Sequence, residues 1–373
     1  MIRVVADKRI PFLEGAFEKY ARVTYLPAGD IGPEQVRDAD ALIVRTRTRC
    51  DERLLAGSAV KYIATATIGY DHIDIDYCRE KGIAWSNAAG CNSGSVKQYV
   101  ASALARITAL DGSRACDLTI GIVGVGQVGR KVERLARLLG MKVLLNDPPR
   151  ERAEGGDNFV DLVTLLGDSD IVTMHVPLNR TGRDKTFHLA DGRFFSLFRR
   201  GGWFINTSRG EVAGTEGLKK ALQSGQLSGA VLDVWENEPA IDRQLLSMAA
   251  IGTPHIAGYS LDGKANGTAQ SVRAISDFFG LGIEWYPENI PGPRNNRIVI
   301  EKDHGGLEGL MQKLFLHTYD IEADSGALKA APENFERFRD NYPVRREFGA
   351  YTLSFDDPSG PEAERFRRIG FRV

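Results

Sequence analysis

The sequence predicts an α/β protein with two parallel-sheet domains and a smaller C-terminal domain. Short apolar runs alternate with amphipathic segments over residues 1–95, and the same alternation resumes at residue 118. A glycine-rich turn at residues 124–129 joins a strand to a helix at the start of the second series. After Pro287 the composition changes to a linker rich in proline and asparagine, so a third segment is expected beyond it.

Length, charge and cysteine content narrow the class of protein. A chain of 373 residues is too long for one typical core, and its hydrophobic content of 43% is ample for burial. The net charge of -1 indicates no nucleic-acid partner, and no apolar stretch is long enough to span a membrane. The N-terminus enters a strand-like run without a signal peptide, and the four cysteines form no CxxC pair. We therefore expect a cytoplasmic protein with reduced thiols and no metal site.

The first series consists of strand-like runs separated by short helix-like segments. Strands are expected at 2–7, 22–27, 41–46, 61–67 and 83–88, and helices at 11–21, 33–39, 51–58 and 72–82. Ligands of parallel sheets bind beyond the carboxyl ends of the strands, which singles out Arg45, Thr46 and residues 67–69 and 87–88. Their hydroxyls and guanidinium suit an anionic, hydroxylated ligand, although ordinary turn chemistry explains each residue equally well.

A loop of small residues, 89–95, is expected to link the two domains before a helix at 96–110. Ser93 or Ser95 can cap this helix, and its N-terminus can hold an anion. A capped hinge without a ligand is an equally good interpretation.

The segment 118–147 has the pattern of a nucleotide-binding unit. An apolar strand ends in Gly124, Gly126 and Gly129, and an amphipathic helix follows immediately, with Gly140 as its left-handed cap. The three glycines allow a tight turn, a close approach of the backbone to a pyrophosphate, and close packing of helix and strand. A second strand ends at Asp147, whose carboxylate suits ribose hydroxyls and disfavours a 2′-phosphate, so NAD is expected. The alternative is a glycine turn that binds nothing.

The alternation continues to about residue 258. Apolar or amphipathic runs occupy 161–167, 170–177, 192–200, 201–208, 214–225, 227–235 and 249–255. With the strands of 118–147 they predict a six-stranded doubly wound domain. A helix within 258–280 can then return to the first domain.

Three features of this domain follow its strands and can carry chemistry. Arg209, within 206–210, can grip a carboxylate and polarise a neighbouring carbonyl. His255 has the proton affinity that oxidation of an alcohol requires, and Glu238 is the carboxylate that would orient its ring. Each residue alone also fits a turn or a loop end. Their occurrence after successive strands of one domain favours the functional interpretation.

Together these residues resemble the family of D-isomer-specific 2-hydroxyacid dehydrogenases. The matching residues are Gly124, Gly126, Gly129, Asp147, Asn206 to Gly210, Asp233, Glu238, Pro239 and His255. The resemblance covers residues 1 to about 285. It implies a flavodoxin-like substrate domain at 1–95 and 259–285, and a Rossmann NAD domain at 96–258. It also implies that Arg209 binds substrate, His255 is the acid/base catalyst, and Glu238 supports that histidine.

Narrower features resemble one branch of this family, which oxidises a four-carbon phosphorylated hydroxy acid. The features are residues 64–72, 90–92, 147–150 and 255–264, together with a C-terminal domain of matching length at 286–373. In that branch the extra domain is an α+β dimerisation domain, so a homodimer is implied.

The branch also implies individual contacts. Substrate contacts are implied for Thr46, Thr67 and Tyr259, and cofactor contacts for Gly124, Gly126, Gln127, Val128, Gly129, Asp147, Val176, Asp233 and Gly258. Val176 stands where a hydroxyl residue is expected, and Thr46 where serine is usual.

The charge of such a substrate calls for more cations than Arg209. Arg45, Arg47 and Lys264 are candidates by their positions, although each can equally be a solvated surface charge. A further hypothesis is that one arginine of a partner subunit helps to bind the phosphate, the candidates in the third segment being Arg345, Arg346, Arg365, Arg367 and Arg368.

Two other functions are compatible with the motifs. One is a different 2-hydroxyacid dehydrogenase, acting on D-3-phosphoglycerate or on glyoxylate and hydroxypyruvate. The other is a non-catalytic, NAD-sensing scaffold of the kind found among transcriptional corepressors of the same superfamily. The C-terminal domain favours neither of these two functions. It favours oxidation of the phosphorylated four-carbon acid.

Overall fold

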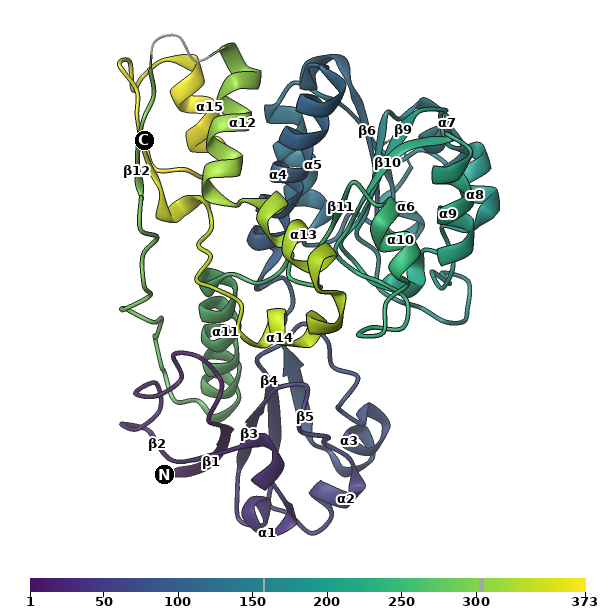
Figure 1. Cartoon of the computed structure of the whole chain (residues 1–373). Helices are drawn as coiled ribbons and strands as arrows, with labels where there is room; N and C mark the ends of the chain where they lie inside the picture. Colours follow the sequence, from purple (N-terminus) through teal and green to yellow (C-terminus); the bar gives the residue numbers. More distant parts are fainter. Residues whose placement is uncertain (157, 302–304) are drawn as a thin grey trace. The chain divides into compact units, whose positions relative to one another are not determined.

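The computed structural model describes residues 1–156, 158–301 and 305–373. These form two compact units (Figure 1), the first made of residues 1–92 and 260–291 and the second of 93–259 and 292–373. None of the helices in the described ranges is long and apolar enough to cross a membrane.

The first unit is built on a five-stranded parallel sheet in the order β2-β1-β3-β4-β5. Its strands are β1 (Ile2–Asp7), β2 (Ala21–Leu26), β3 (Ala41–Val44), β4 (Tyr62–Thr65) and β5 (Ala84–Asn87). This is the flavodoxin-like order, which confirms the predicted class of the domain. Separate apolar clusters, with Phe17 in one and Leu42 in the other, cover the two faces of the sheet.

Short helices and one long helix surround this sheet. They are η1 (Ala28–Asp30), α1 (Pro33–Val36), α2 (Glu52–Leu55), α3 (Ile75–Lys81) and α11 (Leu261–Phe279). The hydroxyl of Ser260 accepts the N–H of Gly263 at 2.8 Å and so caps α11, while Gly280 ends it at a φ of 65°. Val272 and Ile275 of α11 are buried in the cluster on one face of the sheet.

The helix predicted for residues 11–21 is wrong. The segment forms a series of turns, because Phe12 and Gly15 adopt φ angles of 64° and 90° that interrupt any right-handed helix. Leu13 and Phe17 are nevertheless buried against the sheet. The apolar spacing of this segment therefore predicts burial correctly, but it does not predict the conformation of the backbone.

The second unit contains a six-stranded parallel sheet in the order β11-β10-β9-β8-β6-β7. Its strands are β6 (Thr119–Val123), β7 (Lys142–Asn146), β8 (Ile171–Met174), β9 (Gly202–Asn206), β10 (Leu227–Leu232) and β11 (Ile251–Gly252). Beyond β7, Val160 donates its N–H to the carbonyl of Leu145 at 2.8 Å and extends this edge. The strand order reverses beside β6, which makes the carboxyl end of β6 the expected ligand site.

Helices join these strands, and four of them begin with an aspartate cap. They are α4 (Ser93–Asp111), η2 (Ala115–Asp117), α5 (Gly129–Leu138), α6 (Pro148–Glu154), α7 (Leu162–Asp168), α8 (Gly192–Leu197), η3 (Gly210–Val212), α9 (Thr215–Gln223) and α10 (Arg243–Met248). The side chains of Asp147, Asp161, Asp191 and Asp242 cap α6, α7, α8 and α10.

Two of these α-helices, α6 and α10, are not predicted by the sequence. The prolines that follow Asp147 suggest only the end of a strand, yet Pro148 is the first residue of α6, a position that proline favours. The other, α10, begins after Asp242.

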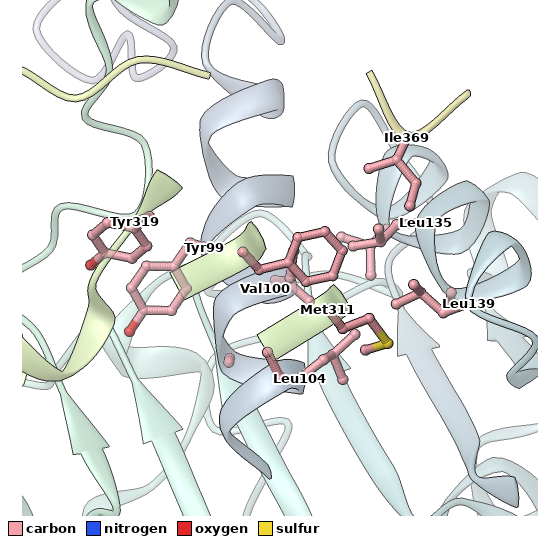
Figure 2. Close-up of a cluster of buried hydrophobic side chains, with 14 of the residues drawn as sticks. Tyr99, Val100, Leu104, Leu135, Leu139, Met311, Tyr319 and Ile369 are labelled. Atoms are coloured by element: carbon pink, nitrogen blue, oxygen red, sulfur yellow. The ribbon is translucent and has the colours of Figure 1, made fainter. Parts of the chain in front are cut away.

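The C-terminal segment, residues 292–373, shares its hydrophobic core with the nucleotide-type domain. It contains β12 (Arg297–Val299), α12 (Gly306–Thr318), α13 (Ile321–Ala330), η4 (Pro332–Asn334), α14 (Phe335–Asp340), η5 (Phe348–Ala350), β13 (Thr352–Ser354) and α15 (Pro361–Ile369). Figure 2 shows Tyr99 and Leu104 of α4 in one cluster with Leu135 of α5, Met311 of α12 and Ile369 of α15. Each fully buried apolar side chain contributes roughly 1.5–3 kcal/mol. This segment is therefore integral to the second unit.

Candidate active site

The glycine turn lies at the carboxyl end of β6 and has the shape of a phosphate cradle. Gly124 has a φ of 87°, and a Cβ on Gly129 would lie 2.1 Å from the carbonyl oxygen of Gly124, so α5 and the turn are in direct contact. Gly126 is exposed, and a Cβ there would meet no atom within 4 Å. No side chain caps α5, whose N-cap residue is Val128. The N–H groups of Arg130 and Lys131 donate to the carbonyls of Gly126 and Val128 at 3.1 and 2.9 Å, whereas the N–H of Gly129 bonds no described residue and remains available to an anion.

Asp147, just after β7, is tied to the same turn. One of its carboxylate oxygens accepts the N–H of Val125 at 2.7 Å, and the other accepts the N–H of Arg150 at 3.1 Å. The Nη1 of Arg150 donates to the carbonyl of Val125 at 2.7 Å. Asp147 and Arg150 therefore hold Val125 from both sides. Sequence reasoning overlooked this role of Arg150.

Residues after β8 lie against the glycine turn. A Cβ on Gly124 would approach Cγ1 of Val176 to 2.8 Å, which places Val176 beside the turn. The ring of the preceding residue, His175, hydrogen-bonds Thr173 at 3.0 Å and Thr207 at 3.3 Å. Burial lowers the pKa of His175 to about 3, so its ring is neutral at physiological pH. The motif pattern did not indicate His175.

The loop after β9 presents Arg209. The side chain of Asn206 accepts the N–H of Ser208 at 3.0 Å and donates to the carbonyl of Arg209 at 3.0 Å, so it shapes the turn that carries the arginine. Arg209 donates from Nη1 to the carbonyl of Ser208 at 2.8 Å. Across the described ranges of the chain it forms no ion pair. Its guanidinium is therefore free to bind an anionic group.

The loop after β10 contacts the Arg209 loop and carries Glu238. A Cβ on Gly210 would lie 1.9 Å from the carbonyl oxygen of Trp235, so the two loops touch. One oxygen of Glu238 accepts the N–H of Trp235 at 2.9 Å, and the other bonds Nδ1 of His255 at 2.7 Å. The predicted pair of Glu238 and His255 is thus formed in the structure.

His255 follows β11 and is partly open to solvent. Its side chain is 31% exposed and that of Glu238 is 19% exposed. Because Nδ1 faces the carboxylate, Nε2 is the nitrogen left for a reacting group, and no other described residue bonds it. His255 has a φ of 56°, an unusual conformation that its surroundings must stabilise. The ring can accept a proton at Nε2 while Glu238 stabilises its charged form.

Asp233 supplies that stabilisation. It is 1% exposed, and its carboxylate accepts the hydroxyl of Thr253 at 2.7 Å and the N–H groups of Ile256 and Ala257 at 2.7 and 2.8 Å. Its backbone carbonyl also accepts the N–H of His255 at 2.7 Å. Asp233, implied as a cofactor contact, is therefore the anchor of the loop 253–259, which bears both His255 and Gly258.

Tyr259 ends this loop beside the C-terminal segment. Its ring meets the ring of Tyr342 edge-on at 5.8 Å, and the guanidinium of Arg339 lies 5.9 Å from its centre. Arg345 is 5% exposed and donates from Nη2 to the carbonyl of Ala257 at 2.5 Å. The hypothesis that Arg345 reaches the substrate of a partner subunit is therefore wrong, because its guanidinium is buried within its own unit.

In the first unit, the predicted substrate residues follow β3 and β4. Thr46 is exposed, whereas Thr67 bonds the hydroxyl of Thr65 at 2.7 Å and donates to the carbonyl of Gly69 at 2.9 Å. Arg45 pairs with Asp7 at 2.9 Å. Desolvation and then the charge of Arg45 lower the pKa of Lys264, so the two cations are near enough to interact electrostatically.

The fold and these loops define the second unit as the dinucleotide-binding domain of a dehydrogenase. Residues 94–257 match the NAD-binding domain of the D-isomer-specific 2-hydroxyacid dehydrogenases, and residues 290–370 match a domain of unknown function, DUF3410. The chain is 52% identical to an erythronate-4-phosphate dehydrogenase of Bacteroides fragilis over 94% of this chain and 99% of the relative. It is 40% identical to that of Escherichia coli O9:H4 over 100% and 98%. The chain belongs to the D-isomer-specific 2-hydroxyacid dehydrogenase family.

Solved structures agree with this assignment. A D-lactate dehydrogenase from Aquifex aeolicus, complexed with NAD and lactic acid, is 27% identical with a TM-score of 0.56, covering 74% of this chain and 95% of that one. The TT0316 protein from Thermus thermophilus is 26% identical with a TM-score of 0.62, covering 77% and 99%. NAD is the cofactor of the family domain. The open backbone at Gly126 and the uncapped start of α5 fit its pyrophosphate.

The two glycines of the turn should respond differently to an added methyl group. Gly129→Ala should lower the free energy of unfolding by about 1–3 kcal/mol, because its Cβ has no room beside Gly124. Gly126→Ala, which meets no protein atom, should leave stability unchanged but weaken NAD binding. Urea unfolding measures the stability of each variant, and fluorescence titration with NADH measures its affinity for the cofactor. Equal loss of stability in the two variants would contradict this view of the turn.

Proposed function

We propose that the protein oxidises 4-phospho-D-erythronate to 2-oxo-3-hydroxy-4-phosphobutanoate with NAD, a step of pyridoxal 5′-phosphate synthesis. The observation that carries the chemistry is the His255–Glu238 pair at 2.7 Å, which joins the loops that follow the neighbouring strands β11 and β10. The choice of substrate rests on the names of relatives 40–52% identical over 94–100% of this chain. The same names favour this substrate over other hydroxy acids, and an enzyme over a corepressor scaffold.

The reaction follows from the roles of three side chains. His255 removes the proton of the C2 hydroxyl at Nε2, and Glu238 stabilises the resulting imidazolium. Arg209 binds the carboxylate and polarises the oxygen of the developing carbonyl. NAD held at the glycine turn would supply the acceptor for the hydride that leaves C2. In the reverse direction His255 returns the proton to the carbonyl oxygen.

The cofactor contacts are proposed along the carboxyl edge of the second sheet. Gly124, Gly126, Gln127, Val128 and Gly129 would hold the pyrophosphate, and Asp147 the adenosine ribose. Val176, Asp233 and Gly258 would then lie toward the nicotinamide. Val176 has no hydroxyl to offer, so its contribution would be a backbone contact or van der Waals packing.

The substrate carries a carboxylate and a phosphate dianion, so it needs cations in addition to Arg209. We propose that Lys264, with Arg45, binds the phosphate and that Thr46, Thr67 and Tyr259 contact the rest of the acid. Burial, and after it the charge of Arg45, lowers the pKa of Lys264, so its ammonium is held at a cost in desolvation and repulsion. A bound dianion would offset both.

Replacement of the acid/base residue tests the proposed reaction. His255→Ala should reduce NADH formation from 4-phospho-D-erythronate by at least about 100-fold, because proton transfer by a positioned base contributes 10²–10⁴-fold. NAD binding should persist, since the glycine turn is untouched. Initial rates with a panel of 2-hydroxy acids, with and without a 4-phosphate, identify the substrate. Near-normal turnover of His255→Ala would disprove its role.

Replacement of Lys264 tests the phosphate contact. Lys264→Met should raise KM for the phosphorylated acid by about 10-fold or more, while KM for the unphosphorylated acid stays the same. Lys19→Met, an exposed site in the same unit, provides the matched loss of charge and should change neither value. An unchanged KM for both acids in Lys264→Met would rule out this contact.

We further propose that the protein is a cytoplasmic homodimer that associates through residues 286–373. The resemblance to the dimerising branch supports this, as do two exposed apolar side chains of the C-terminal segment, Val299 at 69% and Val344 at 58%. Light scattering after size exclusion should give a mass near twice that of the 41.0 kDa chain. A mass equal to one chain at micromolar concentration would refute the dimer.

A further inference from the structure

A buried arginine of the C-terminal segment holds the loop that carries His255. Arg345 donates from Nη2 to the carbonyl of Ala257 at 2.5 Å, and the carbonyl of Ser95 lies 3.5 Å from the same nitrogen. Its guanidinium also lies 4.5 Å from the centre of the Tyr319 ring, within the range of a cation–π interaction. The arginine is thus fixed by α4, by the turn before α13 and by the loop 253–259 at once.

The positive charge of Arg345 is balanced by the carboxylate of Asp324, which is held in place by two tyrosines. Asp324 of α13 accepts the hydroxyl of Tyr319 at 3.0 Å and that of Tyr342 at 2.7 Å. Asp324 also interacts electrostatically with Arg345. Burying a charge costs desolvation free energy, and a buried ion pair adds little to stability by itself. We therefore look for a functional role of the arginine that bonds this loop carbonyl.

The two backbone groups of Ala257 are held from opposite sides by charged residues. Its N–H donates to the carboxylate of Asp233, and its carbonyl accepts from Arg345. His255 lies two residues earlier in the same loop, in a conformation with positive φ. The position of its ring relative to Glu238 therefore depends on an anchor in the C-terminal segment as well as on the one after β10.

We propose that Arg345 is a positioning residue for the dehydrogenase reaction, so that the C-terminal segment takes part in catalysis by holding the loop 253–259. The proposal rests on the role of His255 stated above. It assigns Arg345 no contact with substrate or NAD. Tyr342, which touches both the ring of Tyr259 and Asp324, extends the same support to the end of the loop.

The test compares Arg345→Met, which keeps an unbranched apolar stem but removes the guanidinium, with Arg345→Lys, which keeps a charged donor for the carbonyl of Ala257. Arg345→Met should lower kcat by about 10- to 100-fold, with KM and the Kd for NADH changed by less than about threefold. Arg345→Lys should restore much of kcat. Arg337→Met on α14, an exposed site, is the control for loss of charge and should behave as the wild type.

A merely structural role would give a different result. It would lower the midpoint of thermal unfolding without changing kcat of the folded fraction, or it would lower kcat and NADH affinity together. Either outcome, or Arg345→Lys no better than Arg345→Met, overturns the proposal. If Arg345→Met does not fold, Tyr342→Phe decides: a wild-type kcat overturns the proposal, and a reduced kcat with normal NADH affinity supports it.

Initial rates with the panel of 2-hydroxy acids distinguish a failure of the positioning role of Arg345 from a failure of the proposed substrate. Should the wild type oxidise a different 2-hydroxy acid, the substrate assignment fails, and the same Arg345 variants are then compared on that acid. A fall in kcat limited to Arg345→Met and Tyr342→Phe would still support the positioning role.

Discussion

One buried carboxylate, that of Asp233, determines the geometry on which the proposed chemistry depends. It accepts three hydrogen bonds from the loop that follows β11, and this loop presents His255 to Glu238. Burial raises the pKa of Asp233, while His255 and the three donors act in the opposite direction. The hydrogen bonds that compensate a buried charge are directional, so they also set the path of the backbone. Asp233 can act in this way because β10 and β11 are neighbouring strands.

The C-terminal segment is joined to this arrangement by two kinds of interaction. Its apolar side chains, such as Met311 and Phe315, complete the core around α4, which fastens the segment firmly. Its polar residues Arg345 and Tyr342 then reach the loop 253–259 from a fixed position. Apolar burial supplies stability without direction, whereas the polar contacts supply direction at a cost in desolvation. A segment that contains no predicted catalytic residue thus contacts the loop that carries one.

Much of the fold could be predicted because parallel sheets leave a strong pattern of apolar strands. The strands of both sheets, the glycine turn and the helix that follows it were predicted near their observed positions. The errors occurred where conformation is decided by single residues. Residues 11–21 have the apolar spacing of a helix but include two left-handed residues, and the prolines after Asp147 begin a helix that they seemed to exclude. The pairing of His255 with Glu238 was predicted, but Arg345 was misjudged, because a charged side chain near the C-terminus gives no sign of burial.

By itself the sequence determined the class of fold, the glycine turn, and the residues that can donate, accept or bind charge, since these depend on local spacing and side-chain chemistry. Only the tertiary structure decided which of these groups meet. Strand order brings the loops after β9, β10 and β11 to one edge of the sheet. The burial of Arg345 depends on contacts with residues about 88 and 250 positions away, at Ala257 and Ser95. Such contacts leave no periodic signal in the chain, because they arise from packing between elements and not from spacing within one.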